Sequence, residues 1–344
     1  FGYHNRDYSE ALKTQVDKLM HTSNLFYNEP ITSAAKRVLK ASRMDRVFFT
    51  NSGTEAIEGA LKAAKKYAYT RDGHAGHEII AMNHSFHGRS IGALSVTGTA
   101  HYREPFEPLM GGVKFADFNN LESVKAQITD KTCAIITEVV QGEGGIYPAK
   151  KEFLEGLRQI CDEKDIMLIF DEIQCGMGRT GHYFAWQAYG VQPDIMTSAK
   201  ALGCGVPVGA FVLSEKAAKA SLEPGDHGTT YGGNPFVCAA VSKVFDIYEN
   251  DKIIEHVQEM TPYLEQKLDE IVAKHECAAT RRGMGFMQGI VIQGRPVGEV
   301  VKAALAKGLL VISAGSDVLR IVPPLVITKE HIDKMAAILD ECME

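Results

Sequence analysis

Apolar and polar residues follow two periods along the chain, which predict short strands separated by helices. Continuous or alternating apolar runs predict strands at residues 47–50, 78–82, 132–140, 166–170, 194–197 and 210–213. Apolar residues at helical spacing predict helices from Thr54 onward and over 151–165. Because strands that alternate with helices need crossover connections, we expect an α/β fold with a mostly parallel sheet.

The pattern changes after a long helix expected at about residues 235–249. Helical stretches at 252–274 and 297–307 frame strands at 284–292 and 318–322, which is typical of a smaller α+β domain. We therefore expect three parts: an N-terminal segment, 1–30, that docks on the smaller domain and the site entrance; a large domain, 31–245; and a small C-terminal domain, 246–344.

Charge and composition narrow the classes of function. The 344 residues include 37 basic and 43 acidic ones, a net charge of −6, which argues against nucleic acid or an anionic membrane as the main partner. The longest apolar run, Phe236–Val241, is far too short to span a bilayer. Seven scattered cysteines without a C-x-x-C pair predict reduced thiols and a cytoplasmic protein. Since the chain opens on Phe1 rather than Met, we expect further residues before it.

The first candidate for chemistry is the strand-to-helix turn Asn51-Ser52-Gly53-Thr54-Glu55. Glycine lets a ligand approach the backbone, and the start of a helix offers unpaired N–H groups to a phosphate. The alternative is a plain helix cap, with Ser or Thr as the capping residue.

Two further candidates follow predicted strands. Asp171 and Glu172 end a buried strand, where a carboxylate needs a cationic partner such as a protonated ring nitrogen; the alternatives are a helix cap or a metal ligand. Lys200 follows the strand that ends near Thr197 and could form a Schiff base, or be an exposed loop lysine. A pyridoxal phosphate site requires a phosphate-binding turn, an aspartate and a lysine, and these three occur here in that order along the chain.

These motifs and others in the same order resemble the class III aminotransferases, a branch of the fold type I, aspartate-aminotransferase-like pyridoxal enzymes. The resemblance covers nearly the whole chain. Beyond the three motifs above, it rests on His84–Arg89, Glu138 with Gln141–Gly145, Thr229–Pro235, and Arg320 with Pro323 and Pro324.

The resemblance implies a role for each matching residue. Ser52, Gly53 and Thr54 would hold the phosphate of pyridoxal 5′-phosphate, and Lys200 would carry it as a Schiff base. Phe86 would stack on its ring, Asp171 would pair with the ring nitrogen, and Gln174 would lie near the 3-hydroxyl. Further cofactor contacts are expected from Glu138, Glu172 and Ile173. Thr230 would reach the phosphate of a neighbouring subunit and Thr229 the substrate there, which implies a homodimer with shared sites.

Two arginines are the implied substrate clamps, because a guanidinium binds a carboxylate bidentately. Arg89 would bind the donor carboxylate. Glu143 would pair with Arg320 while the donor is bound and release it for the second carboxylate of 2-oxoglutarate. The alternatives are a structural ion pair for Arg320 and an ordinary loop acid for Glu143.

The implied reaction is a ping-pong transfer of the ω-amino group of N2-acetylornithine to 2-oxoglutarate, giving N-acetylglutamate 5-semialdehyde and glutamate in arginine biosynthesis. Alternatives are related ω-aminotransferases acting on ornithine, succinylornithine, γ-aminobutyrate or a diamine, and a non-catalytic pyridoxal-binding protein.

Histidines 74, 77, 84 and 87 form two H-x-x-H pairs, but the strand between them argues against a metal site, so we expect none.

Overall fold

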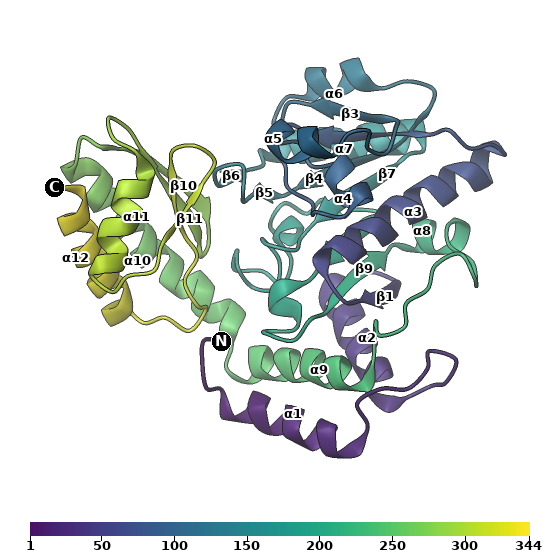
Figure 1. Cartoon of the computed structure of the whole chain (residues 1–344), viewed down its shortest axis with the longest axis horizontal. Coiled ribbons are helices and arrows are strands. Elements are labelled where there is room, and N and C mark those ends of the chain that lie inside the picture. Colours follow the sequence, from purple (N-terminus) through teal and green to yellow (C-terminus); the bar gives the residue numbers. More distant parts are fainter.

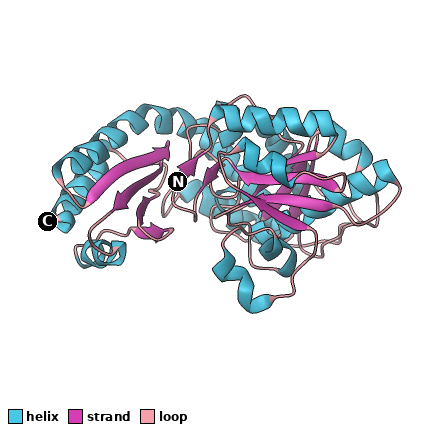
Figure 2. Ribbon diagram, turned by 90° about the horizontal axis from the view of Figure 1, so that it is seen from above, coloured by secondary structure: helices cyan, strands magenta, loops and turns pink.

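A computed structural model describes residues 1–344 and divides them between two bodies, each built on its own sheet (Figures 1 and 2). The larger sheet has the strand order β1-β9-β8-β7-β4-β2-β3. Its strands are β1 (Arg46–Thr50), β2 (Glu78–Met82), β3 (Val113–Ala116), β4 (Thr132–Glu138), β7 (Met167–Asp171), β8 (Ile195–Ser198) and β9 (Gly209–Leu213).

This sheet is mostly parallel, as predicted. Strands β8, β7, β4, β2 and β3 run in one direction, and only β9 is antiparallel to both of its neighbours. The register pairs Glu138 with Asp171, and Asp171 with Thr197. Three polar residues therefore stand side by side where β4, β7 and β8 end, which is the edge where α/β sheets bind ligands.

Helices cover both faces of the sheet, so its strands are buried on both sides. One face packs against α3 (Gly53–Asp72), with Ile169 of β7 among the residues of that apolar cluster. The other packs against α7 (Lys151–Lys164), with Leu168 and Phe170. The remaining large-domain helices are α4 (Ile91–Ser95), α5 (Ala100–Arg103), α6 (Leu121–Gln127), α8 (Glu215–Ala220), and the 3-10 turns Glu104–Phe106, Ala185–Ala188 and Lys200–Leu202. Alternating side chains thus serve two cores, which explains the continuous apolar run.

The smaller body has an antiparallel sheet in the order β10-β11-β13-β12. Its elements are α10 (Ile253–Lys274), β10 (Ala278–Met284), β11 (Met287–Ile292), α11 (Val297–Ala306), β12 (Ile312–Ala314), β13 (Val318–Ile321) and α12 (Lys329–Met343). The strand predicted at 284–292 corresponds to β11, which begins at Met287, and the preceding β10 was missed because it carries few buried residues and exposed ones such as Thr280. Likewise, β4 stops at Glu138, and Val140–Gln141 pairs with Tyr147–Pro148 as the hairpin β5–β6.

The N-terminal segment lies differently from the prediction. Helices α1 (Arg6–Lys18) and α2 (Glu29–Ser42) both pack on α9 (Pro235–Asn250), along one side of the large sheet (Figure 1). The Tyr8 hydroxyl donates to the Gly203 carbonyl of the large domain. Segment 1–30 therefore docks mainly on a large-domain helix, although Gly2 lies beside Val326. Helix α9 also runs through residue 245, so the chain leaves the large domain after Asn250.

No helix combines the length and apolar character needed to cross a bilayer. All seven cysteines are free thiols in the structure.

Candidate active site

A cavity of about 700 Å³ opens at the carboxyl ends of the large sheet. We call it the larger cavity, because a smaller one adjoins it. Nine of the residues predicted to bind the cofactor line it: Ser52, Gly53, Thr54, Phe86, Glu138, Asp171, Ile173, Gln174 and Lys200. These come from separate motifs that the parallel strands bring to one edge, so the fold assembles most of the predicted set.

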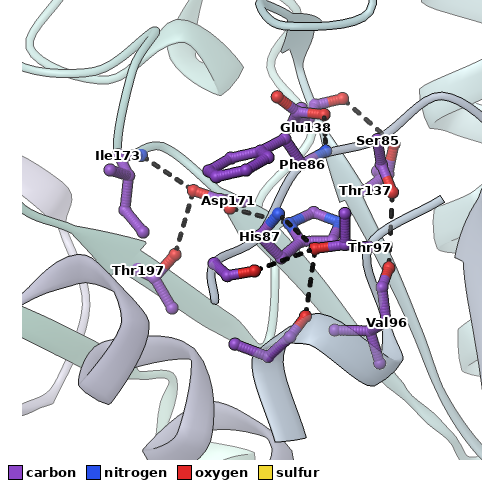
Figure 3. Close-up of polar contacts among 12 residues, drawn as sticks. Ser85, Phe86, His87, Val96, Thr97, Thr137, Glu138, Asp171, Ile173 and Thr197 are labelled. Atoms are coloured by element: carbon purple, nitrogen blue, oxygen red, sulfur yellow. Dashed lines mark hydrogen bonds and ion pairs between the residues drawn. The ribbon is translucent and has the colours of Figure 1, made fainter. Parts of the chain in front are cut away.

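Asp171 lies at the centre of a buried hydrogen-bond network (Figure 3). One carboxylate oxygen accepts from His87 Nδ1 at 2.7 Å, and the other from the Ile173 N–H at 2.9 Å and the Thr197 hydroxyl at 3.3 Å. The His87 N–H donates to the Thr97 hydroxyl at 3.0 Å, which fixes the backbone of the histidine. Asp171 thus accepts three hydrogen bonds at a buried position in the cavity wall.

Glu138 is the second buried acid of the larger cavity. Its oxygens accept from the Phe86 and Gly142 N–H groups, both at 3.3 Å. Burial raises its pKa to about 7, against the opposing pull of His87 and these two N–H groups. A cationic ring bound in the cavity would lower that pKa again.

The turn before α3 acts both as helix cap and as cavity wall. The Ser52 hydroxyl accepts from the Glu55 N–H at 3.2 Å, as a plain cap would. A side chain at Gly53 would place its Cβ 2.9 Å from Ile173 Cδ1, so only glycine fits between the turn and Ile173 without displacing that side chain. The start of a helix therefore faces the larger cavity, where an anion would be stabilised.

Lys200 is the one lysine that lines the larger cavity. It follows β8 at the start of a 3-10 turn and has φ of +47°. A left-handed backbone is unfavourable for a lysine, and such conformations gather at functional sites where the surroundings hold them. The predicted attachment residue is thus held in a strained conformation beside Asp171 and the α3 turn.

This donor set fits pyridoxal phosphate. A helix start offers N–H groups for a phosphate, Asp171 offers a hydrogen-bonded carboxylate for a cationic ring nitrogen, and Lys200 offers an amine for an aldehyde. Phe86 provides an aromatic face among the same lining residues.

A smaller cavity of about 340 Å³ adjoins the larger one and shares Ile173, Gln174, Lys200 and Ala201 with it. Arg320, on β13, reaches it from the small domain and pairs with Glu143 at 2.5 Å. Arg320 also donates to the Gln174 side-chain oxygen at 3.2 Å, and the Gln174 amide donates to Glu143 at 3.3 Å. The acid and arginine predicted to form a switch are therefore in contact.

Glu172 does not take the place predicted for it. Its carboxylate points away from the larger cavity and accepts from the Ala185 and Trp186 N–H groups at 2.8 and 2.9 Å. Burial raises its pKa to about 7. Because successive strand residues face opposite ways, Asp171 and Glu172 divide between cofactor chemistry and anchoring of the following loop.

Three other predicted residues lie outside both cavities of their own chain. The Arg89 guanidinium lies over the Phe86 and Tyr102 rings, 5.5 and 4.9 Å from their centroids. Thr229 accepts from the Asn51 amide at 3.3 Å, and neither Thr229 nor Thr230 lines a cavity described here.

Of the four histidines considered for a metal, His74 and His77 lie together, whereas His87 lies elsewhere, at Asp171. His74 and His77 stack at 5.0 Å beside Asp72, but that carboxylate already pairs with Arg71. His87 instead contacts Asp171, a role that the sequence analysis did not predict.

Comparison with known proteins agrees with the fold. The aminotransferase class-III family matches residues 1–343. Acetylornithine aminotransferase of Methanocaldococcus jannaschii is 48% identical over 336 residues, 96% of this chain and 83% of that protein. Succinylornithine transaminase of Yersinia pseudotuberculosis is 44% identical over 331 residues, 94% of this chain and 80% of that protein.

Among solved structures, ornithine aminotransferase from Toxoplasma gondii superposes with a TM-score of 0.94 and 29% identity, covering 99% of this chain and 83% of that one. The chain therefore belongs to the class-III aminotransferases, which are pyridoxal-phosphate-dependent enzymes.

Proposed function

We propose that the enzyme transfers the ω-amino group of N2-acetylornithine to 2-oxoglutarate, a step of arginine biosynthesis. The observation that carries the donor is the 48% identity, over nearly the whole chain, to a relative named for acetylornithine. The contact between Glu143 and Arg320 supports a dicarboxylate acceptor, because an arginine released from its acid can bind the second carboxylate. The product of the first half-reaction would be N-acetylglutamate 5-semialdehyde, and that of the second glutamate.

When bound, pyridoxal phosphate supplies an electron sink that eases loss of a proton from the carbon next to the amine. Gly53 and Thr54 would hold its phosphate and Phe86 its ring. Asp171, held by His87 and Thr197, would keep a proton on the ring nitrogen. The Lys200 amine would accept the proton from the substrate carbon that bears the amine and carry it to the carbon on the other side of that nitrogen. Gln174 would orient the ring substituents, while Arg89 would bind the donor carboxylate.

Succinylornithine is the second candidate donor, because a relative named for it is almost as similar. Absorbance of the cofactor-loaded enzyme, after single additions of acetylornithine, succinylornithine, ornithine or γ-aminobutyrate without acceptor, separates the donors. We expect acetylornithine to convert the cofactor fastest. Faster conversion by ornithine would contradict the proposed donor and leave the transaminase intact.

We also propose a homodimer. The side chains of Leu25, Phe26 and Tyr27 are 87%, 66% and 102% exposed, an unusual number of large apolar groups for one loop. This loop lies beside Thr229, whose carbonyl accepts from the Asn24 amide at 2.9 Å. A second copy covering the loop would carry Thr229 and Thr230 toward its partner's cavity. Light scattering should give twice the chain mass; a monomer with full activity would contradict shared sites.

A cytoplasmic location remains our proposal, and it rests on the seven free cysteines. Fractionation of cells that make the full-length protein would test it, and an exported protein would contradict it.

A further inference from the structure

Arg179 connects the two domains through both its side chain and its backbone. It lies in the loop after β7, and its Nη1 donates to the Phe286 carbonyl at 3.4 Å and to the Pro323 carbonyl. In return, the Arg179 carbonyl accepts from the Phe286 N–H at 2.8 Å. One large-domain residue therefore holds two separate small-domain segments.

Both segments are connected to β13, the strand that carries Arg320. Pro323 follows Arg320 closely in the chain, and Phe286 lies in the turn between β10 and β11, the strand that pairs with β13. The two segments lie close together at this point, because a Cβ at Gly285 would lie 2.6 Å from the Arg179 carbonyl oxygen. Gly285 also has φ of +59°, so both the short distance and the backbone conformation favour glycine there. Movement of Arg179 would therefore shift the strand pair that presents Arg320.

Arg179 also changes the charge of the smaller cavity. It lines that cavity with Glu143 and Arg320, and it forms no ion pair of its own. The only acid in the lining, Glu143, is already paired with Arg320. Burial lowers the pKa of the Arg179 guanidinium, which reflects the cost of a buried cation without a counter-ion. An incoming carboxylate would relieve that cost.

We propose that Arg179 is a positioning residue that makes the smaller cavity selective for dicarboxylates. It holds the segment that carries Arg320 against the β7 loop, and it adds a positive charge that Glu143 does not offset. The inference rests on the proposed function, since 2-oxoglutarate is the dicarboxylate concerned.

The test uses two unreactive probes of equal chain length. Glutarate carries two carboxylates and pentanoate one, and neither has a keto group to react. Calorimetric titration of the full-length, cofactor-loaded enzyme gives the ratio of their affinities. The variants are Arg179→Gln, which removes the charge, and Arg179→Lys, which keeps the charge but not the planar guanidinium group with its several N–H donors. Arg281→Gln is the matched control, because Arg281 pairs with Asp269 and Glu265 on the small domain.

We expect Arg179→Gln to weaken glutarate binding about tenfold, because Arg320 loses its support and the smaller cavity loses a positive charge, and to weaken pentanoate binding less than about twofold. Arg179→Lys should weaken glutarate about threefold, and Arg281→Gln should leave both probes unchanged. If Arg179→Gln does not fold, the Lys variant carries the test.

Two failures are distinguishable. Equal affinity of the wild-type enzyme for both probes would overturn the dicarboxylate acceptor itself. A wild-type preference for glutarate that the variants retain in full would overturn only the role of Arg179.

Discussion

The two adjoining cavities are built in different ways. Every residue that lines the larger cavity comes from the large domain, between Asn51 and Val208. The smaller cavity joins large-domain residues such as Arg179 to Ile312, Arg320 and Val322 of the small domain. Sheet register therefore fixes the charges of the larger cavity, whereas docking of one domain on the other fixes those of the smaller. The first should be the more rigid site and the second the more adjustable one.

The largest effect is expected from Lys200→Ala, which removes the only lysine of the larger cavity. Turnover should fall by about a thousandfold or more, because both the covalent attachment and the proton carrier are lost. Borohydride reduction followed by peptide mass spectrometry should find no cofactor on the chain. A lysine at the surface, Lys219→Ala, serves as control. Cofactor mass still attached to the Lys200→Ala chain would place the anchor elsewhere.

An intermediate effect, confined to one half-reaction, is expected from Arg320→Ala. The half-reaction with 2-oxoglutarate should slow about a hundredfold, because a carboxylate loses its arginine while Glu143 loses its partner. Stopped-flow absorbance of each half-reaction measures the two losses separately, and Glu143→Gln shows what the acid alone contributes. If the donor half-reaction suffers as much as the acceptor half-reaction, the switch between Glu143 and Arg320 is wrong.

The smallest effect concerns Glu172, which anchors the loop at Ala185 and Trp186. Its pKa is raised from 4.5 to about 7, so the folded protein keeps a proton that the unfolded chain releases. The stability linked to that proton is complete below about pH 4.5 and is lost as the pH rises to about 7, by up to roughly 3 kcal/mol.

Replacement by Gln removes this titration. The Tm of the wild-type enzyme should therefore fall relative to that of Glu172→Gln between pH 5 and pH 8, by a few degrees. Glu215→Gln, at an exposed position, should follow the wild type. Parallel curves for wild type and Glu172→Gln would show that Glu172 titrates normally.

The sequence allowed the residues of the larger cavity to be predicted better than the contacts they make. The α3 turn, Asp171 and Lys200 each end or follow a strand with a clear apolar pattern, and parallel strands bring their carboxyl ends together. The direction of Glu172 depended on the backbone of a distant loop, Ala185–Trp186, which no local pattern indicates. The contact of His87 with Asp171 and the hydrogen bond from Arg179 to Phe286 also join residues far apart in the sequence, so no local pattern indicates them.

The order of the chain has a consequence for biosynthesis. The lining of the larger cavity is complete by Val208, and the last strand of its sheet by Leu213, whereas Arg320 is made much later. Because domains generally fold as units while the ribosome still extends the chain, the large domain, complete at Asn250, should fold before Arg320 is added. Translation should thus form the wall of the larger cavity first and supply the acceptor arginine afterwards.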